Sequence, residues 1–260
     1  MPATFDALLT HLSGLPLGDW QFLEETGSTN DVALTWAMAG CPDFSLVVAN
    51  SQTAGRGRLA RRWFTNPNSA LAFSLVVRPT PAEMPALNWF APLGGLAVSE
   101  ALLGLGLAAE IKWPNDVLVG GRKLCGILSE TVWAESTLKA VVLGIGINIA
   151  PSSVPPADQL QFPATCVEDE LGSLISRWEL LRDVLWALAQ WRARLKEPAF
   201  LAAWQERLAF KGQWVRVAPA GREGLLGMVS GIDPSGALVL LDHNGTRHII
   251  EAGDVHLRPA

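Results

Sequence analysis

The part of this sequence best suited to chemistry is a segment in which arginines are interspersed with glycines. Residues 51–63 read SQTAGRGRLARRW and follow an apolar run at residues 45–50. Guanidinium groups bind carboxylates and phosphates through paired hydrogen bonds. Gly55 and Gly57 permit positive φ angles and allow backbone N–H groups to approach a ligand closely. The segment therefore predicts an anion-binding loop, although a basic loop that only faces water has the same composition.

Other motifs with polar residues and glycines are spread along the chain. They are Ser28-Thr29-Asn30, Gln52, KWPND at residues 112–116, KLCG at residues 123–126 and GIGIN at residues 144–148. Taken alone, Ser28, Thr29 or Asn30 has an ordinary explanation as the cap of a helix. The glycines at 144 and 146 indicate either a close approach by a ligand or a β-bulge. Only the combination of these motifs points to a binding site.

Several common chemistries are absent from the sequence. The motifs GxxxxGKS/T, GxSxG and HExxH do not occur, and the four histidines lack metal-ligand spacing. Residues 55–60 match the dinucleotide fingerprint GxGxxA in form. Arginines fill two of its three variable positions, however, and no acidic residue stands where it would bind a ribose. These observations set aside phosphate-loop, serine-hydrolase and zinc-protease sites and disfavour a dinucleotide fold.

Composition and charge favour a folded protein of the cytoplasm. The 260 residues include 25 acidic and 20 basic side chains, so the arginine segment is a positive feature on a chain of net charge −5. A general nucleic-acid binder would carry a basic stripe or a high pI. Three scattered cysteines without a CxxC motif are typical of a reduced chain. We therefore expect a cytoplasmic protein that does not bind DNA.

One apolar stretch, residues 91–111, resembles a membrane span in its composition. Glu100 near its middle would cost about 2.5–3.5 kcal/mol at the centre of a bilayer, and Gly104 and Gly106 interrupt the stretch. We therefore expect a buried helix followed by a turn, and no membrane association.

The elements around the motifs follow from apolar periodicity and turn residues. Helices are predicted at residues 4–12, 32–39, 87–103, 173–197 and 199–208. Strands are predicted at residues 20–24, 45–50, 71–78 and 138–149, with three more between residues 109 and 133. From residue 211 the chain has short strands separated by turn signals, which is typical of a small antiparallel barrel or sheet. The sequence thus predicts two domains, residues 1–208 and 209–260.

Taken together and in order, the motifs resemble those of the catalytic domain of the biotin–protein ligases. That family is marked by an STN segment, a GRGRxGRxW loop, a KWPND turn, a KxxGIL strand and a GxGINV-like strand. The matching segments here are residues 28–30, 55–63, 112–116, 123–128 and 144–149. The sequence departs from the family at Ala60, where glycine is usual, and in lacking the N-terminal DNA-binding domain of the bifunctional members. The resemblance is therefore to the monofunctional type, which has no repressor function.

The resemblance implies a fold and a two-step reaction. The fold is α+β, with a mixed or antiparallel sheet packed against helices, as in class II synthetases, and a small C-terminal SH3-like β-barrel. In the reaction, the carboxylate of biotin attacks the α-phosphorus of ATP, and the resulting biotinyl-5′-AMP acylates a specific lysine of a biotin carboxyl carrier domain. Because two anions meet in the first step, cations and oriented N–H donors are required there.

The resemblance also implies roles for individual residues. Lys123 and Arg58 are expected to be catalytic and to hold the carboxylate, the phosphate and then the adenylate. The residues expected to bind biotin are Ser28, Thr29, Asn30, Gln52, Gly55, Arg56, Gly57, Arg58, Lys123 and Gly126. Those expected to bind ATP or the adenylate are Arg58, Trp63, Lys112, Asn115 and Asn148. Asp116 is a candidate ligand of Mg²⁺, with a turn-stabilising role as the alternative.

Two other functions share part of this pattern. A lipoate–protein ligase has the same fold and adenylation chemistry, but the Arg-Gly-Arg loop and the KWPND turn favour biotin. A sensor that binds biotinyl-adenylate without transferring it is disfavoured by Lys123 and by the lack of a DNA-binding segment. The expected substrates are ATP and biotin with Mg²⁺, and the expected partner is the carboxyl carrier domain of a biotin-dependent carboxylase. The chain is expected to be a monomer or a homodimer.

Overall fold

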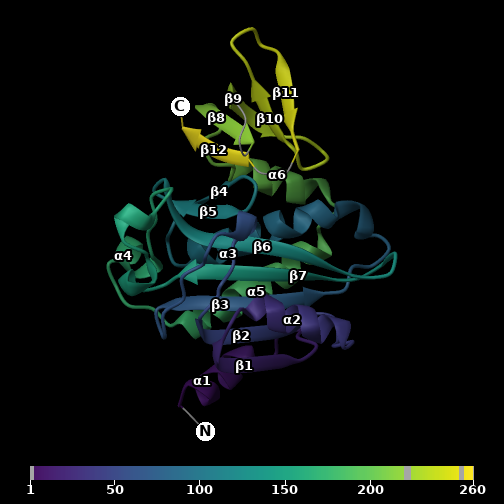
Figure 1. Ribbon diagram of the computed structural model, residues 1–260, viewed down its shortest axis with the longest axis vertical. Coiled ribbons are helices and arrows are strands. Elements are labelled where there is room, and N and C mark those ends of the chain that lie inside the picture. The colour runs from purple at the N-terminus through teal and green to yellow at the C-terminus, as the bar shows by residue number, and fades with distance from the viewer. Residues whose placement is uncertain (1–2, 220–223, 252–254, 260) are drawn as a thin grey trace.

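The computed structural model describes residues 3–219, 224–251 and 255–259, which form two β-sheets flanked by helices (Figure 1). The larger sheet has seven strands in the order β1-β2-β3-β7-β6-β5-β4. Its strands are β1 (Trp20–Thr26), β2 (Ser45–Gln52), β3 (Ala70–Val77), β4 (Ala109–Lys112), β5 (Asp116–Val119), β6 (Arg122–Ala134) and β7 (Thr137–Asn148). In this sheet β1 pairs in parallel with β2, and the other neighbours pair antiparallel. The sheet is therefore mixed, and the predicted fold class is confirmed.

Helices cover both faces of the seven-stranded sheet. α3 (Phe90–Gly104) and α5 (Arg177–Ala193) pack against each other on one face, and α2 (Thr29–Met38) lies on the other. The other α-helices of the described residues are α1 (Ala3–Leu12), α4 (Val167–Leu171) and α6 (Pro198–Glu206). Short 3₁₀ turns occur at Arg58–Ala60, Met84–Trp89, Pro151–Ser153 and Ala157–Gln159.

Alternation along β7 decides which face of the sheet can carry a site. Successive side chains of a strand point to opposite faces. Val141 and Ile145 belong to the main core with α3 and α5, whereas Val142 packs in the smaller cluster under α2. Gly144 and Gly146 follow Val142 on the α2 face. That face thus changes from apolar side chains to a strip without side chains, which leaves room for a cavity.

The apolar stretch at residues 91–111, expected to be a buried helix, does contain one. Met84–Gly104 is the part of the described chain that is long and apolar enough to cross a membrane, yet α3 within it is packed in the core. Glu100 lies on the exposed side of α3 and accepts a hydrogen bond from the Trp191 indole at 2.9 Å. Gly106, with φ of 85°, makes the turn after the helix. The expected buried helix and turn are therefore confirmed.

The helix predicted at residues 173–197 is shorter than expected. α5 begins after Ser176, whose hydroxyl accepts a hydrogen bond from the backbone N–H of Glu179 at 3.3 Å. Leu174, which lies within the predicted range, precedes α5 and is 86% exposed. A serine that satisfies a free N–H of the first turn starts the helix, and this local signal outweighed the apolar periodicity.

The second sheet is antiparallel, with five strands in the order β11-β10-β9-β8-β12, and is called the C-terminal sheet below. Its strands are β8 (Trp214–Pro219), β9 (Leu225–Ile232), β10 (Leu238–Leu241), β11 (Arg247–Ile250) and β12 (Val255–Pro259). Residues 207–209 lead into it and run along β4. Ile111 N donates to the Arg207 carbonyl at 2.6 Å, and Ala209 N donates to the Ile111 carbonyl at 3.0 Å. The domain boundary predicted after residue 208 stays a prediction, and it falls inside this paired segment.

Candidate active site

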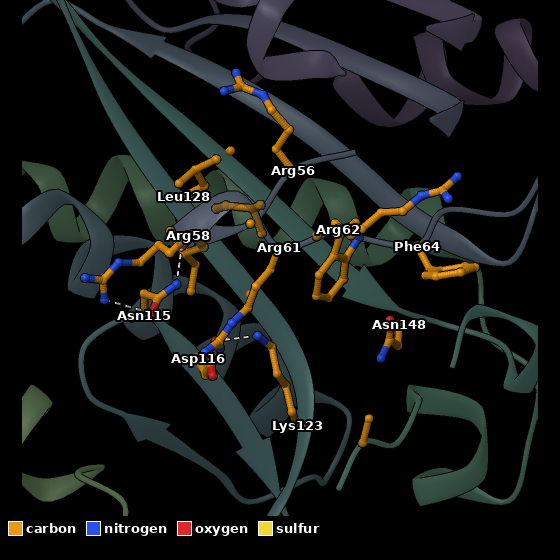
Figure 2. A pocket seen from close by; sticks show the side chains of 18 of the residues that line it. Arg56, Arg58, Arg61, Arg62, Phe64, Asn115, Asp116, Lys123, Leu128 and Asn148 are labelled. Atoms are coloured by element: carbon orange, nitrogen blue, oxygen red, sulfur yellow. Dashed lines mark hydrogen bonds and ion pairs between the residues drawn. The ribbon is translucent and has the colours of Figure 1, made fainter. Parts of the chain in front are cut away.

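A cavity of about 430 Å³ lies on the α2 face of the seven-stranded sheet (Figure 2). Residues from every motif of the sequence contribute to its wall. The predicted site residues that line it are Ser28, Thr29, Asn30, Gln52, Arg56, Gly57, Arg58, Trp63, Lys112, Asn115, Asp116, Lys123, Gly126 and Asn148. Gly55 is the predicted residue that is absent from this wall. The fold therefore brings motifs that are distant in the sequence to one place.

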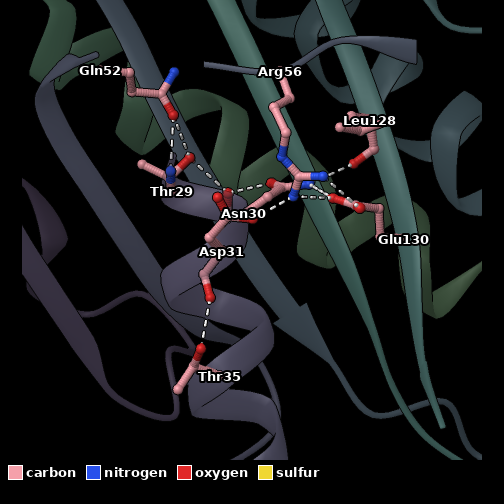
Figure 3. A network of polar contacts seen from close by, with 9 residues as sticks. Thr29, Asn30, Asp31, Thr35, Gln52, Arg56, Leu128 and Glu130 are labelled. Carbon is pink, nitrogen blue, oxygen red and sulfur yellow. Dashed lines mark hydrogen bonds and ion pairs between the residues drawn. The ribbon is translucent and has the colours of Figure 1, made fainter. Parts of the chain in front are cut away.

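At one end of the cavity lie four polar side chains, here called the polar cluster: Thr29 and Asn30 on α2, Gln52 on β2 and Ser74 on β3. Figure 3 shows Thr29, Asn30 and Gln52. Thr29 donates from its backbone N–H and its hydroxyl to Gln52 Oε1, at 2.8 and 3.1 Å. Asn30 Oδ1 accepts from the Ser74 hydroxyl at 2.5 Å, and the Asn30 amide donates to Glu130 Oε2 at 2.7 Å. Because each member orients its neighbour, the polar cluster offers donors and acceptors in fixed positions.

The polar cluster corrects the interpretation of the STN segment as a helix cap. Ser28 does stand at the N-cap of α2, but its side chain makes no cap hydrogen bond. Thr29 and Asn30 lie in the first turn with 4% and 3% of their surface exposed, and their side chains serve the polar cluster. Ser74 belongs to the same cluster and was missed, because a lone serine within an apolar strand has no distinguishing pattern in the sequence.

The glycines of β7 make room for side chains of the chain itself. A Cβ on Gly144 would lie 2.1 Å from Asn30 Oδ1, and one on Gly146 would lie 2.3 Å from the Trp63 indole. Gly126 stands opposite Gly146 in a continuous β6–β7 register, so the indole rests on a flat patch of backbone. The β-bulge alternative is therefore wrong at these positions, and the close approach is made by Asn30 and Trp63.

The arginine segment forms a short hairpin beside the cavity, here called the arginine hairpin (residues 55–63). Trp63 N donates to the Gly55 carbonyl at 2.8 Å, and Gly57 N donates to the Arg61 carbonyl at 2.7 Å. Gly55 and Gly57 do not use the positive φ that glycine permits, and Leu59 has it instead, at 60°. Gly55 is required for space, since a Cβ there would lie 2.5 Å from the Trp63 carbonyl oxygen.

Arg56 ties the arginine hairpin to two other elements. Its guanidinium lies 2.5 Å from Asp31 Oδ1 on α2 and 3.1 Å from Glu130 Oε2 on β6 (Figure 3). These partly exposed ion pairs add modest stability, but they fix the direction of the Arg56 side chain. Both carboxylates were missed at the level of sequence, because they are 25 and 74 positions from Arg56 and carry no motif of their own.

Toward the other end of the cavity, Asp116 pairs with Lys123 (Figure 2) and with Lys112, and these three residues are called the cationic cluster. The Asp116 carboxylate is 2.6 Å from Lys123 Nζ and 3.6 Å from Lys112 Nζ. Burial alone would raise the pKa of Asp116, but the two positive charges outweigh it and hold the pKa below its usual value. Burial also lowers the pKa of Lys112, against the effect of Asp116. Two cations face one carboxylate, so the cluster favours an incoming anion.

Arg58 and the two predicted asparagines surround the cationic cluster. Arg58 Nη1 donates to Asn115 Oδ1 at 3.4 Å, and Asn115 Nδ2 donates to the Ile127 carbonyl at 2.7 Å. Asn148 is buried and donates to the Thr165 carbonyl at 3.0 Å. Both asparagines thus brace the cavity wall, and their contacts with a nucleotide stay predictions.

The fold and the cavity together correspond to a known class of protein. Residues 22–148 match the family model described as Biotin/lipoate A/B protein ligase family. Residues 212–258 match the model of the Biotin protein ligase C terminal domain. The mixed sheet, the cavity on its α2 face and the C-terminal sheet therefore define a ligase of the biotin/lipoate class.

The similarity to individual proteins extends over most of the chain. The biotin–[acetyl-CoA-carboxylase] ligase of Paracoccus denitrificans is 37% identical over 90% of this chain and 98% of the relative. The enzyme of the same name from Mycobacterium tuberculosis is 35% identical over 92% of this chain and 90% of the relative. The biotin protein ligase from Aquifex aeolicus in complex with biotin and ATP has a TM-score of 0.80 at 28% identity, covering 93% of this chain and 99% of that chain. This chain belongs to the biotin protein ligase family.

Proposed function

We propose that this chain is an ATP-dependent biotin–[acetyl-CoA-carboxylase] ligase that forms biotinyl-5′-AMP and transfers biotin to a lysine of the carboxyl carrier domain. The observation that carries the proposal is the presence of the polar cluster and the cationic cluster in one cavity. The relatives that share most of the chain have this name, and the Aquifex structure contains biotin and ATP. The site thus has separate places for a polar ring and for two reacting anions.

The polar cluster suits the ureido ring of biotin. That ring has one carbonyl and two N–H groups within an otherwise apolar bicycle, so it requires a few fixed polar partners. Thr29, Asn30 and Gln52 line the cavity and supply donors and acceptors, and the buried Ser74 hydroxyl orients Asn30 from behind. With the ring held there, the carboxylate of biotin extends along the cavity toward the cationic cluster.

The cationic cluster suits the first step of the reaction. A carboxylate oxygen of biotin attacks the α-phosphorus of ATP, an oxygen–phosphorus bond forms, and the bond to pyrophosphate breaks. Negative charge gathers on the α-phosphoryl oxygens, and Lys123 offers fixed positive charge where it gathers, while Arg58 would hold the adenylate once it has formed. Trp63, seated on Gly126 and Gly146, presents an aromatic ring for the adenine.

A Mg²⁺ ion fits this site as an ion shared with phosphate oxygens. Among the described residues, Asp116 is the acidic side chain that lines the cavity, and no group of three or more His, Cys, Asp or Glu side chains could hold a metal. Mg²⁺ is commonly bound by one or two carboxylates together with substrate phosphates. Asp116 would hold the ion with ATP, and the ion would supply further positive charge to the phosphates.

In the second step, the amine of the acceptor lysine attacks the carbonyl carbon of biotinyl-AMP. An amide forms, AMP leaves, and the amine gives up a proton. The arginine hairpin is held in place by the ion pairs of Arg56 with Asp31 and Glu130. It would keep water from biotinyl-AMP until the acceptor domain docks. We further propose that the chain acts in the cytoplasm as a monomer or homodimer, and binds neither DNA nor membranes.

The proposal predicts ATP–pyrophosphate exchange that depends on biotin. Purified protein with MgATP and labelled pyrophosphate is expected to exchange label when biotin is added and to show only background with lipoate. Exchange supported by lipoate instead would favour the lipoate ligase. Exchange with biotin but no transfer to a purified carrier domain would favour the adenylate sensor.

The packing of the Trp63 indole on Gly126 and Gly146 supports a second prediction. Gly146→Ala is expected to push the indole off the sheet, because the new Cβ would lie 2.3 Å from it. Overpacking of this kind should lower the free energy of unfolding by about 1–3 kcal/mol and weaken ATP binding. Chemical denaturation and the KM for ATP measure the two effects. Gly104→Ala is the control, since a Cβ there meets nothing within 4 Å. Equal losses of stability and of ATP binding in both variants would show that Gly146 is not required to make room for the Trp63 indole.

A further inference from the structure

A turn of the C-terminal sheet is docked on the larger sheet beside the KWPND segment. The turn joins β9 to β10. Its Gly236 carbonyl accepts a hydrogen bond from Trp113 Nε1 at 3.1 Å, and its Ser235 carbonyl accepts one from the Asn88 side-chain amide. Trp113 is 2% exposed, so its indole N–H is satisfied inside the protein by the backbone of the C-terminal sheet.

The same type of turn occurs a second time in the C-terminal sheet, between β10 and β11. In Asp233-Pro-Ser-Gly236 and Asp242-His-Asn-Gly245, the aspartate accepts from the N–H groups two and four residues further on. The glycines have φ of +88° and +78°. A Cβ on Gly236 would lie 3.0 Å from Trp89 Nε1, whereas one on Gly245 would meet nothing within 4 Å. The first turn thus packs against Asn88, Trp89 and Trp113, whereas its twin is open.

Trp113 connects the docked turn to the active site through the backbone. The Trp113–Pro114 peptide bond is cis, and Asn115 and Asp116 follow directly. Asp116 pairs with Lys123 at 2.6 Å. Among the described residues, none of the C-terminal sheet lines the cavity, so the docked turn can affect the site only through residues such as Trp113.

A second set of contacts holds the same segment from its other end. β4 ends at Lys112, immediately before Trp113, and residues 207–209 pair with Ile111 of this strand on the way to the C-terminal sheet. The Ile111 backbone and the Trp113 side chain are therefore both held by the chain that belongs to, or leads into, the C-terminal sheet.

We infer that the β9–β10 turn is a positioning element for adenylate formation, which holds Trp113 and thereby places Asn115 and Asp116 for the first chemical step. This inference rests on the proposed function. Small displacements of catalytic groups can cost orders of magnitude in rate, so pushing the turn off Trp113 should slow adenylation even when no acceptor is present. Biotin binding, which uses the polar cluster, should change little.

Paired substitutions of the twin glycines test the inference. Gly236→Ala and Gly245→Ala each add one methyl group at a positive φ, so they strain equivalent turns in a similar way. Only the Gly236 methyl group meets Trp89. We expect the kcat of ATP–pyrophosphate exchange to fall on the order of tenfold in Gly236→Ala, with the KM for biotin unchanged. Gly245→Ala should behave as the wild type.

Asn88→Ala provides a test that adds no strain. Asn88 is exposed, and its loss removes one donor to the docked turn. We expect a smaller fall in kcat in the same direction. If thermal unfolding shows that Gly236→Ala does not fold, an unchanged kcat in Asn88→Ala overturns the inference.

Three further outcomes would also overturn the positioning role. They are equal exchange by the two glycine variants and the wild type, equal losses in both glycine variants, and a loss confined to the KM for the acceptor in the transfer step. A wild-type protein without biotin-dependent exchange would overturn the proposed function instead, so the two failures can be told apart.

Discussion

Replacing Lys123 with alanine is expected to slow adenylate formation by roughly 10²–10³-fold, the scale of one lost transition-state donor. Lys123 Nζ lies 2.6 Å from Asp116, and it is the nearer of the two lysines to that carboxylate. Without it, Asp116 faces the incoming phosphates with less positive charge beside it, that of Lys112 and Arg61. The pKa of Asp116, which burial raises and the lysines hold down, should then move up. ATP–pyrophosphate exchange at saturating biotin and MgATP measures the loss.

Lys139→Ala is the matched control for the Lys123 variant. Lys139 is an exposed lysine of β7 that does not line the cavity, so its removal changes the net charge equally without touching the site. Thermal unfolding of both proteins checks that the fold is retained. A Lys123→Ala exchange rate close to that of the control would contradict a role for Lys123 in the first step.

Replacing Arg58 with glycine is expected to release the reactive intermediate rather than to abolish its formation. Arg58 belongs to the arginine hairpin and reaches Asn115 at 3.4 Å, at the side of the cavity where the adenylate would lie. Loss of its charge and of its bulk should leave adenylation measurable while biotinyl-AMP escapes and acylates exposed lysines in solution. The measurement is a biotin blot of a bystander protein incubated with the variant, biotin and MgATP.

Arg62→Gly controls for the added flexibility of the arginine hairpin. It makes the same substitution in the same segment, but Arg62 donates to the Thr53 carbonyl at 3.1 Å and extends away from Asp116 and Lys123 (Figure 2). Bystander labelling should therefore stay near the wild-type level. If Arg58→Gly makes adenylate and labels the bystander no more than this control, the retention role is wrong and Arg58 belongs to the first step.

Much of the site could be predicted from the sequence because its residues sit in short motifs with a local physical meaning. The strand at residues 138–149 was recognisable from its apolar run, and alternation then places Gly144 and Gly146 together on one face. Gly120 and Gly121 both have positive φ in the turn between β5 and β6, a conformation that glycine adopts without strain. Local patterns of this kind predict the structure correctly because they depend only on residues a few positions away in the sequence.

The remaining features depend on pairings that only the fold creates. Asp31 and Glu130 become partners of Arg56 because α2 and β6 face each other across the arginine hairpin. The glycines at 144 and 146 indicated a ligand or a β-bulge, whereas in the fold the Trp63 indole packs directly on Gly146. A sequence specifies such contacts only through the sheet order, which no single motif contains.

β4 forms one side of the seven-stranded sheet, and a bare edge strand there would present unpaired N–H and C=O groups to other molecules. The segment at residues 207–209 covers part of this side through its hydrogen bonds with Ile111. A chain cut after residue 208, at the boundary that the sequence suggests, would keep the bond to Arg207 but lose the Ala209 bond, which leaves more of this edge unpaired. Such edges recruit further strands and promote aggregation. We therefore expect residues 1–208 expressed alone to be less soluble than the whole chain.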